Sequence, residues 1–494
     1  MQAALLKPSK FNSFIKNEKN ETIMYNSLTG NLVKFSENME NMIQEIFSKD
    51  IINRSDIKNE ELITKGFLIP SFSNENLMLN SVYTDIISEP MLNLTILTTE
   101  KCNFRCNYCF ENNYNHHTQE MSLEVEDAIV DFVRKNIGSV RGVDIGWFGG
   151  EPLMRMDIIR DISQKIIAIC KENKKLYCAS ISTNGYLLTP EVFKELYKYR
   201  VFEYQVTLDG LSETHDKSRF LANGKPTFDV IINNLKAIKE TCPTEHVNFS
   251  IRTNCDQNVI TNLQDFIQFF EDTFFPDMRF KVYFALVKDL GGSISSQVKK
   301  SFLKIDEIQL AEKAFSLFTH KECFDLRYCF GRLLPGNGCG YMKKGTYAVS
   351  PNGLLSKCST HFQNYSFCNV GEIKNGKFIT DPYMEALWTY DLNYNDMLDD
   401  KICAGCTMKP ICISYFCPVN KVKCLFEGKD YSFVCLWGEK EKRIWEIQRS
   451  FGYNLTDQWR RETGLAELHH RLADFCILGD EGRPSVRLYF RVQP

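Results

Sequence analysis

Residues 92–110 read Leu-Asn-Leu-Thr-Ile-Leu-Thr-Thr-Glu-Lys-Cys-Asn-Phe-Arg-Cys-Asn-Tyr-Cys-Phe. A strand-like apolar run ends in this stretch, and Cys102, Cys106 and Cys109 follow it within eight residues. A strand that ends in such a loop directs three thiolates toward one point. A closed zinc or iron–sulfur site normally takes four ligands, so three cysteines leave one position open for chemistry.

The spacing Cys-x3-Cys-x2-Cys, with the aromatic Tyr108 just before its last cysteine, resembles the cluster loop of the radical S-adenosylmethionine enzymes. The resemblance implies a [4Fe–4S] cluster held by Cys102, Cys106 and Cys109. It also implies that the amino and carboxylate groups of S-adenosyl-L-methionine chelate the fourth iron. A zinc knuckle or a plain ferredoxin-type loop is the alternative for the cysteines taken alone.

Composition limits the class of protein and its partners. The chain has 494 residues, 44% of them hydrophobic and 24% charged, which suits a globular protein of two or three domains. Its net charge of -3 gives no electrostatic case for nucleic acid or for an anionic membrane as partner. The N-terminus lacks the apolar core of a secretory signal, and no run approaches the roughly 18 apolar residues of a membrane helix. We therefore expect a cytoplasmic protein.

Nineteen cysteines are many for such a chain. Because the chain is large and shows no export signal, their short clustered spacings indicate metal or redox chemistry rather than disulfides.

Short apolar strands alternate with amphipathic helices between about residues 92 and 300. The predicted strands are 92–98, 143–148, 177–182, 202–208, 248–253 and 279–285, and the first helix is 122–135. This alternation predicts an α/β fold with a parallel sheet and ligands at the carboxyl ends of its strands. The resemblance implies a partial (β/α)6 TIM-like barrel.

Distinctive short motifs follow these strands. Two glycines in Gly149-Gly150-Glu151-Pro152 would let the backbone approach a ligand closely, while exposed amides and Glu151 could satisfy an amino group. Each motif alone could be an ordinary turn, but their order matches the family. The cofactor-binding residues that the resemblance implies are Gly149, Gly150, Glu151, Pro152, Ser182, Asn184, Asp209 and Arg252.

A second cysteine-rich region, 321–447, resembles the SPASM extension of peptide-modifying radical enzymes, which holds two auxiliary [4Fe–4S] clusters. The resemblance assigns Cys339, Cys358 and Cys417 to one cluster and Cys403, Cys406, Cys412 and Cys435 to the other. The fourth ligand of the first cluster is unassigned: Cys329, Cys368 and Cys424 are candidates, or the site is open to substrate. Four residues separate Cys412 from Cys417, where the family usually has three. A zinc ribbon is the alternative, and in either case metal ligation is expected to replace a large hydrophobic core.

The two ends of the chain are expected to be separate segments. Residues 1–90 predict a hairpin at 22–26 and 31–35, helices at 38–47 and 59–65 and a short strand at 66–70, which suggests a winged-helix-like unit. Nine Lys and Arg against twelve Asp and Glu favour a peptide over DNA as its ligand, with a structural cap as the alternative. We place domain boundaries at 1–90, 91–320, 321–447 and 448–494, and the arginine-rich tail has no assigned function.

The resemblance covers roughly residues 92–440 and implies a radical S-adenosylmethionine peptide maturase. A 5′-deoxyadenosyl radical would abstract hydrogen from a ribosomally made peptide, with a cysteine thioether of the sactipeptide or ranthipeptide type as the leading product. The expected partners are a precursor peptide with a leader and an electron donor such as flavodoxin or ferredoxin. One alternative is an anaerobic sulfatase-maturating enzyme, although Ser359 stands where that family has an aspartate. Peptide epimerisation and carbon–carbon crosslinking are alternative reactions. A non-enzymatic zinc-binding protein is the alternative from a different class.

Overall fold

The computed structural model describes most of the chain up to residue 391 and short pieces beyond it. The described ranges are 4–16, 22–36, 39–88, 90–113, 120–242, 244, 246–289, 296–305, 307–325, 339–360, 366–391, 405–410, 418–419, 422–423 and 427. Several residues named above lie outside these ranges. They are the expected ligands Cys403, Cys412, Cys417 and Cys435, the candidate ligands Cys329 and Cys424, and the segment 448–494.

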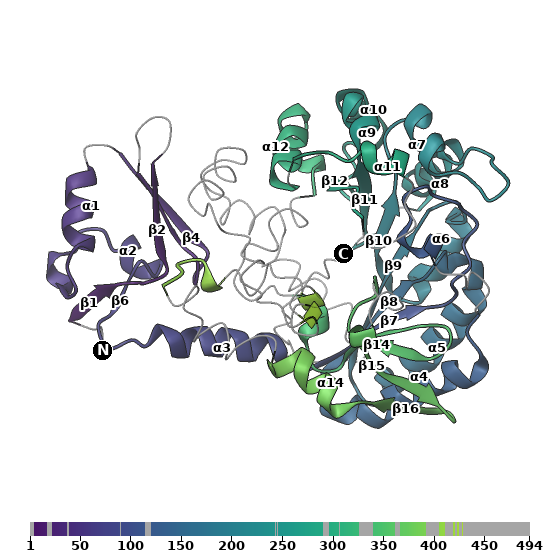
Figure 1. Ribbon diagram of the computed structural model, residues 1–494, viewed down its shortest axis with the longest axis horizontal. Coiled ribbons are helices and arrows are strands. Elements are labelled where there is room, and N and C mark those ends of the chain that lie inside the picture. Colours follow the sequence, from purple (N-terminus) through teal and green to yellow (C-terminus); the bar gives the residue numbers. More distant parts are fainter. Residues whose placement is uncertain are drawn as a thin grey trace.

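A ten-stranded sheet forms the centre of the larger part of the molecule (Figure 1). Six of its strands lie side by side in chain order, and all their neighbouring pairs are parallel. They are β7 (Met91–Leu97), β8 (Gly142–Phe148), β9 (Leu176–Thr183), β10 (Val201–Thr207), β11 (Asn248–Cys255) and β12 (Phe280–Leu286). The predicted α/β class with its parallel sheet is confirmed, with strand ends displaced by one or two residues.

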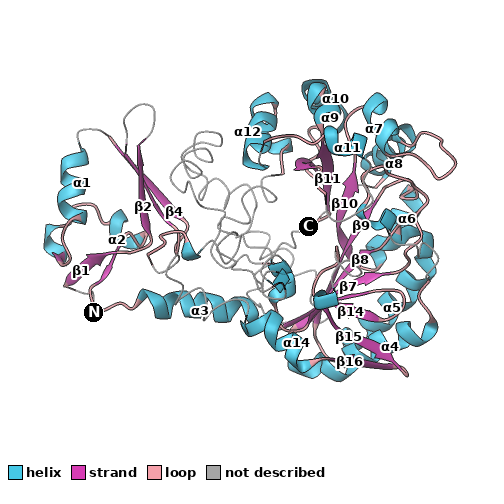
Figure 2. Cartoon of the chain, viewed as in Figure 1, coloured by secondary structure: helices cyan, strands magenta, loops and turns pink. Residues whose placement is uncertain are grey.

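Helices connect these strands and lie along one side of the sheet (Figure 2). They are α4 (Leu123–Asn136), α5 (Met156–Glu172), α6 (Pro190–Lys198), α7 (Ser212–Ser218), α8 (Phe228–Thr241), α9 (Gln257–Thr261) and α10 (Leu263–Phe274), followed by α11 (Ser296–Lys300) and α12 (Glu307–Leu317). None of the helices in the described ranges combines the length and the apolar character that crossing a membrane requires.

Local chemistry explains where α4 begins and ends. The hydroxyl of Ser122 accepts a hydrogen bond from the Val125 amide, which caps the first turn. Acidic residues occupy the first turn, and Arg134 and Lys135 occupy the last, so both ends complement the helix dipole. The predicted helix 122–135 is therefore confirmed with Ser122 as its cap.

The other four strands extend the same sheet past β7. They are β13 (Thr346–Val349), β14 (Leu354–Ser356), β15 (Asn369–Lys374) and β16 (Lys377–Thr380). β13 runs parallel to β7, and β13 to β16 pair with one another antiparallel. Val349, Leu355 and Val370 belong to the main hydrophobic core. The expectation that metal ligation replaces a hydrophobic core is wrong for 346–380, because the apolar residues of these strands pack into the same core as those of β7.

The first ninety residues form two small antiparallel sheets with their own core. Their elements are β1 (Leu5–Pro8), β2 (Asn12–Lys16), β3 (Thr22–Asn26), β4 (Asn31–Phe35), α1 (Glu40–Phe47), β5 (Ile52–Asn53), α2 (Glu61–Thr64), β6 (Leu68–Pro70) and α3 (Glu75–Ile87). The predicted hairpin 22–35, both helices and the strand near 68 are confirmed. β1, β2 and α3 were not predicted, and α3 leads from this part toward the large sheet (Figure 1).

Candidate active site

The cysteine loop follows the carboxyl end of β7 and is fastened to one neighbouring segment. Backbone amides of Arg105 and Asn107 donate to the carbonyls of Phe220 (2.8 Å) and Ser218 (3.1 Å). In the opposite direction, the Ala222 amide donates to the Asn103 carbonyl (2.8 Å), and Phe104 and Leu221 form an isolated antiparallel β-bridge. Because the bonds run in both directions, residues 218–222 set the path of the loop.

The three thiols suit an iron–sulfur cluster chemically. Cys106 is buried and Cys102 and Cys109 are half-buried. Burial raises the pKa of Cys102 to about 12, with the nearby Glu151 carboxylate adding to the effect. Iron must therefore displace these protons when it binds. The described residues contain no three His, Cys, Asp or Glu side chains gathered around a single metal ion. Three thiolates are nonetheless the donor type of an iron–sulfur cluster, in which each cysteine would bind a different iron.

The two glycines after β8 serve a purpose that differs from the expected one. A Cβ on Gly149 would lie 2.4 Å from the carbonyl oxygen of Thr99, and one on Gly150 would lie 2.3 Å from that of Lys101. The Gly150 and Glu151 amides already donate to these carbonyls, at 3.0 and 2.9 Å. The expectation of exposed amides for a ligand is therefore wrong: the close approach is made by the backbone that leads into Cys102.

Glu151 joins the ends of two strands from a fully buried position. Its carboxylate accepts from the Thr183 hydroxyl (2.7 Å), the Asn184 amide (2.8 Å) and the Leu153 amide (3.1 Å). Burial raises its pKa, and these donors oppose that rise. Pro152 is buried in the short turn that follows. Since a carboxylate offers about four lone-pair sites, little acceptor capacity is left for a ligand.

Asn184 lies against the cysteine loop. Its side-chain amide donates to the Asn103 side-chain oxygen (2.8 Å), and its nitrogen lies 4.0 Å from the sulfur of Cys102. Ser182, two residues earlier, is half-buried and accepts from Gln205 on β10 (3.3 Å). Asn184 is thus within reach of a group bound by the cysteines, whereas Ser182 contacts the neighbouring strand β10.

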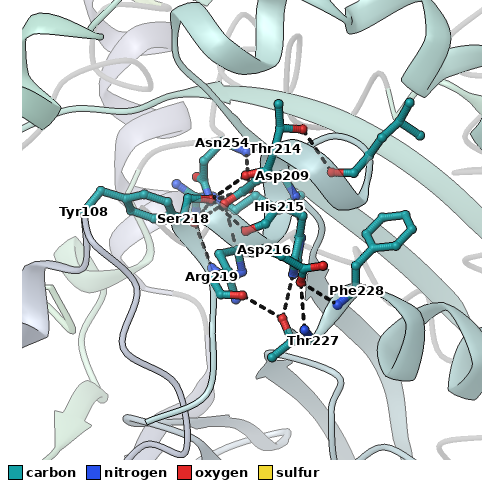
Figure 3. A network of polar contacts seen from close by, with 12 residues as sticks. Tyr108, Asp209, Thr214, His215, Asp216, Ser218, Arg219, Thr227, Phe228 and Asn254 are labelled. Atoms are coloured by element: carbon teal, nitrogen blue, oxygen red, sulfur yellow. Dashed lines mark hydrogen bonds and ion pairs between the residues drawn. The ribbon is translucent and has the colours of Figure 1, made fainter. Parts of the chain in front are cut away.

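Asp209 belongs to a polar network that includes Tyr108 of the loop (Figure 3), and Arg252 joins this network through Asn254. The buried carboxylate of Asp209 accepts from the Tyr108 hydroxyl and from both nitrogens of Asn254, at 2.8 and 3.2 Å. Arg252 donates from Nε to the Asn254 side-chain oxygen (2.9 Å). Both oxygens of Asp209, a predicted cofactor-binding residue, have partners inside the protein.

His215 closes the network from α7. Its Nδ1 accepts from the Asp209 amide (3.1 Å), so the ring is neutral and Nε2 carries the proton toward the Thr227 hydroxyl (3.1 Å). Burial holds its pKa well below the usual value, and the nearby Arg219 adds to this. The roles of His215, Tyr108 and Asn254 were not predicted from the sequence, because contacts between strand ends leave no local pattern.

Only part of the expected auxiliary set is described. Cys339 and Cys406 are half-buried and Cys358 and Cys368 are buried. The Ser356 hydroxyl donates to the carbonyls of Cys358 and Cys368, both at 3.1 Å, because the antiparallel pairing of β14 with β15 returns the chain to this point. The structure therefore brings the backbone of one expected ligand next to that of one candidate fourth ligand.

Three comparisons relate the chain to known proteins. Residues 96–257 match the model of the radical SAM superfamily. The cyclopropyl synthase TigE of Paramaledivibacter caminithermalis is 25% identical over 267 residues, 47% of this chain and 54% of the relative. Fe-coproporphyrin III synthase of Methanosarcina barkeri is 28% identical over 311 residues, 57% and 72% of the two chains.

The solved structure titled native anSMEcpe with bound AdoMet and Kp18Cys peptide aligns with a TM-score of 0.50 at 18% identity. It covers 64% of this chain and 88% of that one, and it supports the fold alone. The chain spans about half the length of TigE, so the matched region rather than the whole protein carries the relationship. The cysteine loop and the strand-end motifs all lie inside residues 96–257, the region of this chain that matches the radical SAM superfamily.

Proposed function

We propose that this enzyme modifies a ribosomally made peptide by hydrogen abstraction. The observation that carries the proposal is the cysteine loop, which is held against the carboxyl ends of parallel strands and contacts Asn184. Cys102, Cys106 and Cys109 would hold a [4Fe–4S] cluster, which when bound supplies the electron that cleaves S-adenosyl-L-methionine to methionine and a 5′-deoxyadenosyl radical.

The chain's own residues would bind and orient S-adenosyl-L-methionine at the strand ends. Arg252 presents a guanidinium that suits a carboxylate or a ribose, and Asn254 fixes its direction through the Nε hydrogen bond. Ser182 and Asn184 offer hydroxyl and amide groups at the end of β9, two strands nearer to the loop. Glu151, Gly149, Gly150 and Asp209 would act indirectly, because they position the loop and the strand ends.

Peptide recognition is assigned to the first ninety residues. Their two small sheets present edge strands, and an extended leader can add to such an edge by backbone hydrogen bonds. The Ser13 hydroxyl on β2 donates to the Thr407 hydroxyl (2.7 Å), next to the expected ligand Cys406. This contact supports a substrate route from the N-terminal part toward the cysteine-rich part.

Thioether formation is the reaction we favour. One C–H and one S–H bond are replaced by one C–S bond, so the peptide loses two hydrogens and two electrons. The adenosyl radical takes one hydrogen atom, the thiol proton goes to solvent and the remaining electron needs an acceptor. Auxiliary clusters, held by Cys339, Cys358 and Cys417 and by Cys403, Cys406, Cys412 and Cys435, would supply this one-electron chemistry when bound. Flavodoxin or ferredoxin would serve as the external donor.

Sulfatase maturation has less support from these residues. That reaction expects an aspartate directly after Cys358, and the buried Ser359 occupies the position. A hydroxyl in place of a carboxylate is a poor proton acceptor at neutral pH.

The decisive measurement is 5′-deoxyadenosine production by anaerobically reconstituted enzyme given dithionite and S-adenosyl-L-methionine. The Cys102/Cys106/Cys109→Ala variant should produce none, whereas Cys170→Ala, which removes a buried thiol of α5, should retain production. Candidate precursor peptides encoded beside the gene are then added, and mass spectrometry should show a loss of two hydrogens. Production without any such loss would exclude the thioether while leaving radical chemistry in place. Zinc bound in place of iron would overturn the whole proposal.

A further inference from the structure

We propose that Arg219 and Asp209 form a buried pair that sets the reduction potential of the loop cluster, the arginine favouring the reduced state and the aspartate opposing it. The inference rests on the proposed cluster at Cys102, Cys106 and Cys109. It concerns two residues that reach the cluster through the protein rather than by ligation.

Tyr108 connects this pair to the cysteine loop (Figure 3). Its hydroxyl donates to Asp209 Oδ2 and accepts from Arg219 Nη1 (2.8 Å) and from Asn254 Nδ2 (3.1 Å). Tyr108 stands between Cys106 and Cys109 in sequence, so a hydroxyl with three partners restrains both cysteines. Hydrogen bonds therefore link the pair to the loop that would carry the cluster.

Arg219 is buried, with 7% of its surface exposed. Its Nε lies 4.0 Å from Asp209 Oδ2 and has no hydrogen-bond partner among the described residues. The guanidinium stands 5.7 Å from the ring centroid of Phe104, a loop residue, and the carbonyls of Ser218 and Phe220 on either side bind loop amides. The guanidinium thus contacts the loop through the Tyr108 hydroxyl, while Asp209 lies at the limit of ion-pair distance.

The two charges act on the loop with opposite signs. Arg219, a cation, and Asp209, an anion, both contact the hydroxyl of Tyr108, which lies between Cys106 and Cys109 in the loop. Reduction of a cluster, like loss of a thiol proton, adds negative charge at the same place. In a site of low dielectric a buried cation favours the added electron and a buried carboxylate disfavours it.

Opposite shifts distinguish this electrostatic role from a structural one. Asp209→Asn keeps the shape and removes the negative charge, and Arg219→Met removes the positive charge while retaining an apolar chain of similar length. Loss of packing would disturb the loop in the same sense in both variants. An effect of charge requires the reduction potential of the loop cluster to rise in Asp209→Asn and to fall in Arg219→Met.

The experiment is an anaerobic redox titration followed by electron paramagnetic resonance. The loop cluster's signal is identified by its absence in the Cys102/Cys106/Cys109→Ala variant. We expect the ratio of reduced to oxidised cluster at a fixed potential to fall about tenfold in Arg219→Met, equivalent to about 59 mV, and to rise in Asp209→Asn. Arg219→Lys should retain most of the wild-type potential. Arg160→Met, which breaks an exposed ion pair with Glu195, should leave it unchanged.

Each outcome bears on the inference. Unchanged potentials, or shifts of the same sign in the two variants, would overturn it while the cluster itself stands. If Arg219→Met fails to fold, the sign of the shift in Asp209→Asn decides alone. A wild-type protein that takes up no iron through the three cysteines would overturn the proposed function, and this inference with it.

Discussion

Substitution of Gly150 by alanine tests whether the backbone contact after β8 builds the cysteine loop. The new methyl group would lie 2.3 Å from the Lys101 carbonyl oxygen and 2.6 Å from that of Glu100. Both atoms belong to the backbone, so no side-chain rotation can relieve the overlap. The segment 100–101 must move away instead, and Cys102 follows it directly.

The expected cost combines two terms. Forcing an extra methyl group into a packed site typically costs about 1–3 kcal/mol. Displacement of residue 101 also stretches the hydrogen bond from the Glu151 amide to the Lys101 carbonyl, now 2.9 Å, which contributes about 0.5–1.5 kcal/mol. We therefore expect the free energy of unfolding of the iron-free protein to fall by about 2–4 kcal/mol, and iron uptake to fall with it.

Two other glycines supply matched controls. A methyl group on Gly138 meets no atom within 4 Å, so Gly138→Ala should leave stability within about 0.5 kcal/mol of wild type. Gly224 also has open space but a φ of +80°, so alanine there should cost about 1–2 kcal/mol from the backbone alone and leave iron uptake intact. Urea unfolding and iron content are measured for all three variants. Wild-type stability and full iron uptake in Gly150→Ala would refute the reasoning.

Three further outcomes follow from contacts of the site. Thr183→Val removes the hydroxyl donor at 2.7 Å from the buried Glu151 carboxylate, so urea unfolding should show a loss of about 1–3 kcal/mol; an unchanged midpoint would mean that another donor replaces it. His215 is neutral when folded and its pKa is depressed, so the unfolded chain binds its proton first as pH falls below about 6.5. Stability of the iron-free protein should decline through that range, and His215→Asn, which keeps an acceptor for the Asp209 amide, should flatten the decline. Removal of iron by a chelator should abolish 5′-deoxyadenosine production, and anaerobic reconstitution should restore it in wild type but not in Cys102/Cys106/Cys109→Ala.

The sheet was predictable because its signals are local. The apolar strands β8 to β12 alternate with helices along the chain. The capping and charged residues of a helix lie within or next to it in sequence, as Ser122 and Arg134 do for α4. The hairpin formed by β3 and β4 was predictable in the same way from the turn sequence between them. Each of these elements is specified within about a dozen residues, and neighbouring parallel strands follow one another along the chain.

The pairing of β13 with β7 could not be foreseen in this way. Thr346 stands opposite Asn93, and only the burial of Tyr347 and Val349 against the core of the sheet selects that position. Turn signals and cysteines dominate the sequence around these strands, which directed the interpretation toward metal ligation. An apolar strand of four residues carries too little pattern to show which distant edge it will join.

The motif residues of the site also hold the strand ends and the cysteine loop together. Asp209 binds Tyr108 of the cysteine loop, and Glu151 binds Asn184, which in turn binds Asn103 of that loop. The strand-end motifs are thus partners of one another and of the loop, and their order along the chain reflects the order of the strands that meet there. A residue required by its motif can therefore be required for shape. Arg252 and Ser182, whose side chains are only half-buried, are the stronger candidates for direct contact with the cofactor, whereas substitutions at Glu151 or Asp209 should change the loop first and cofactor binding as a consequence.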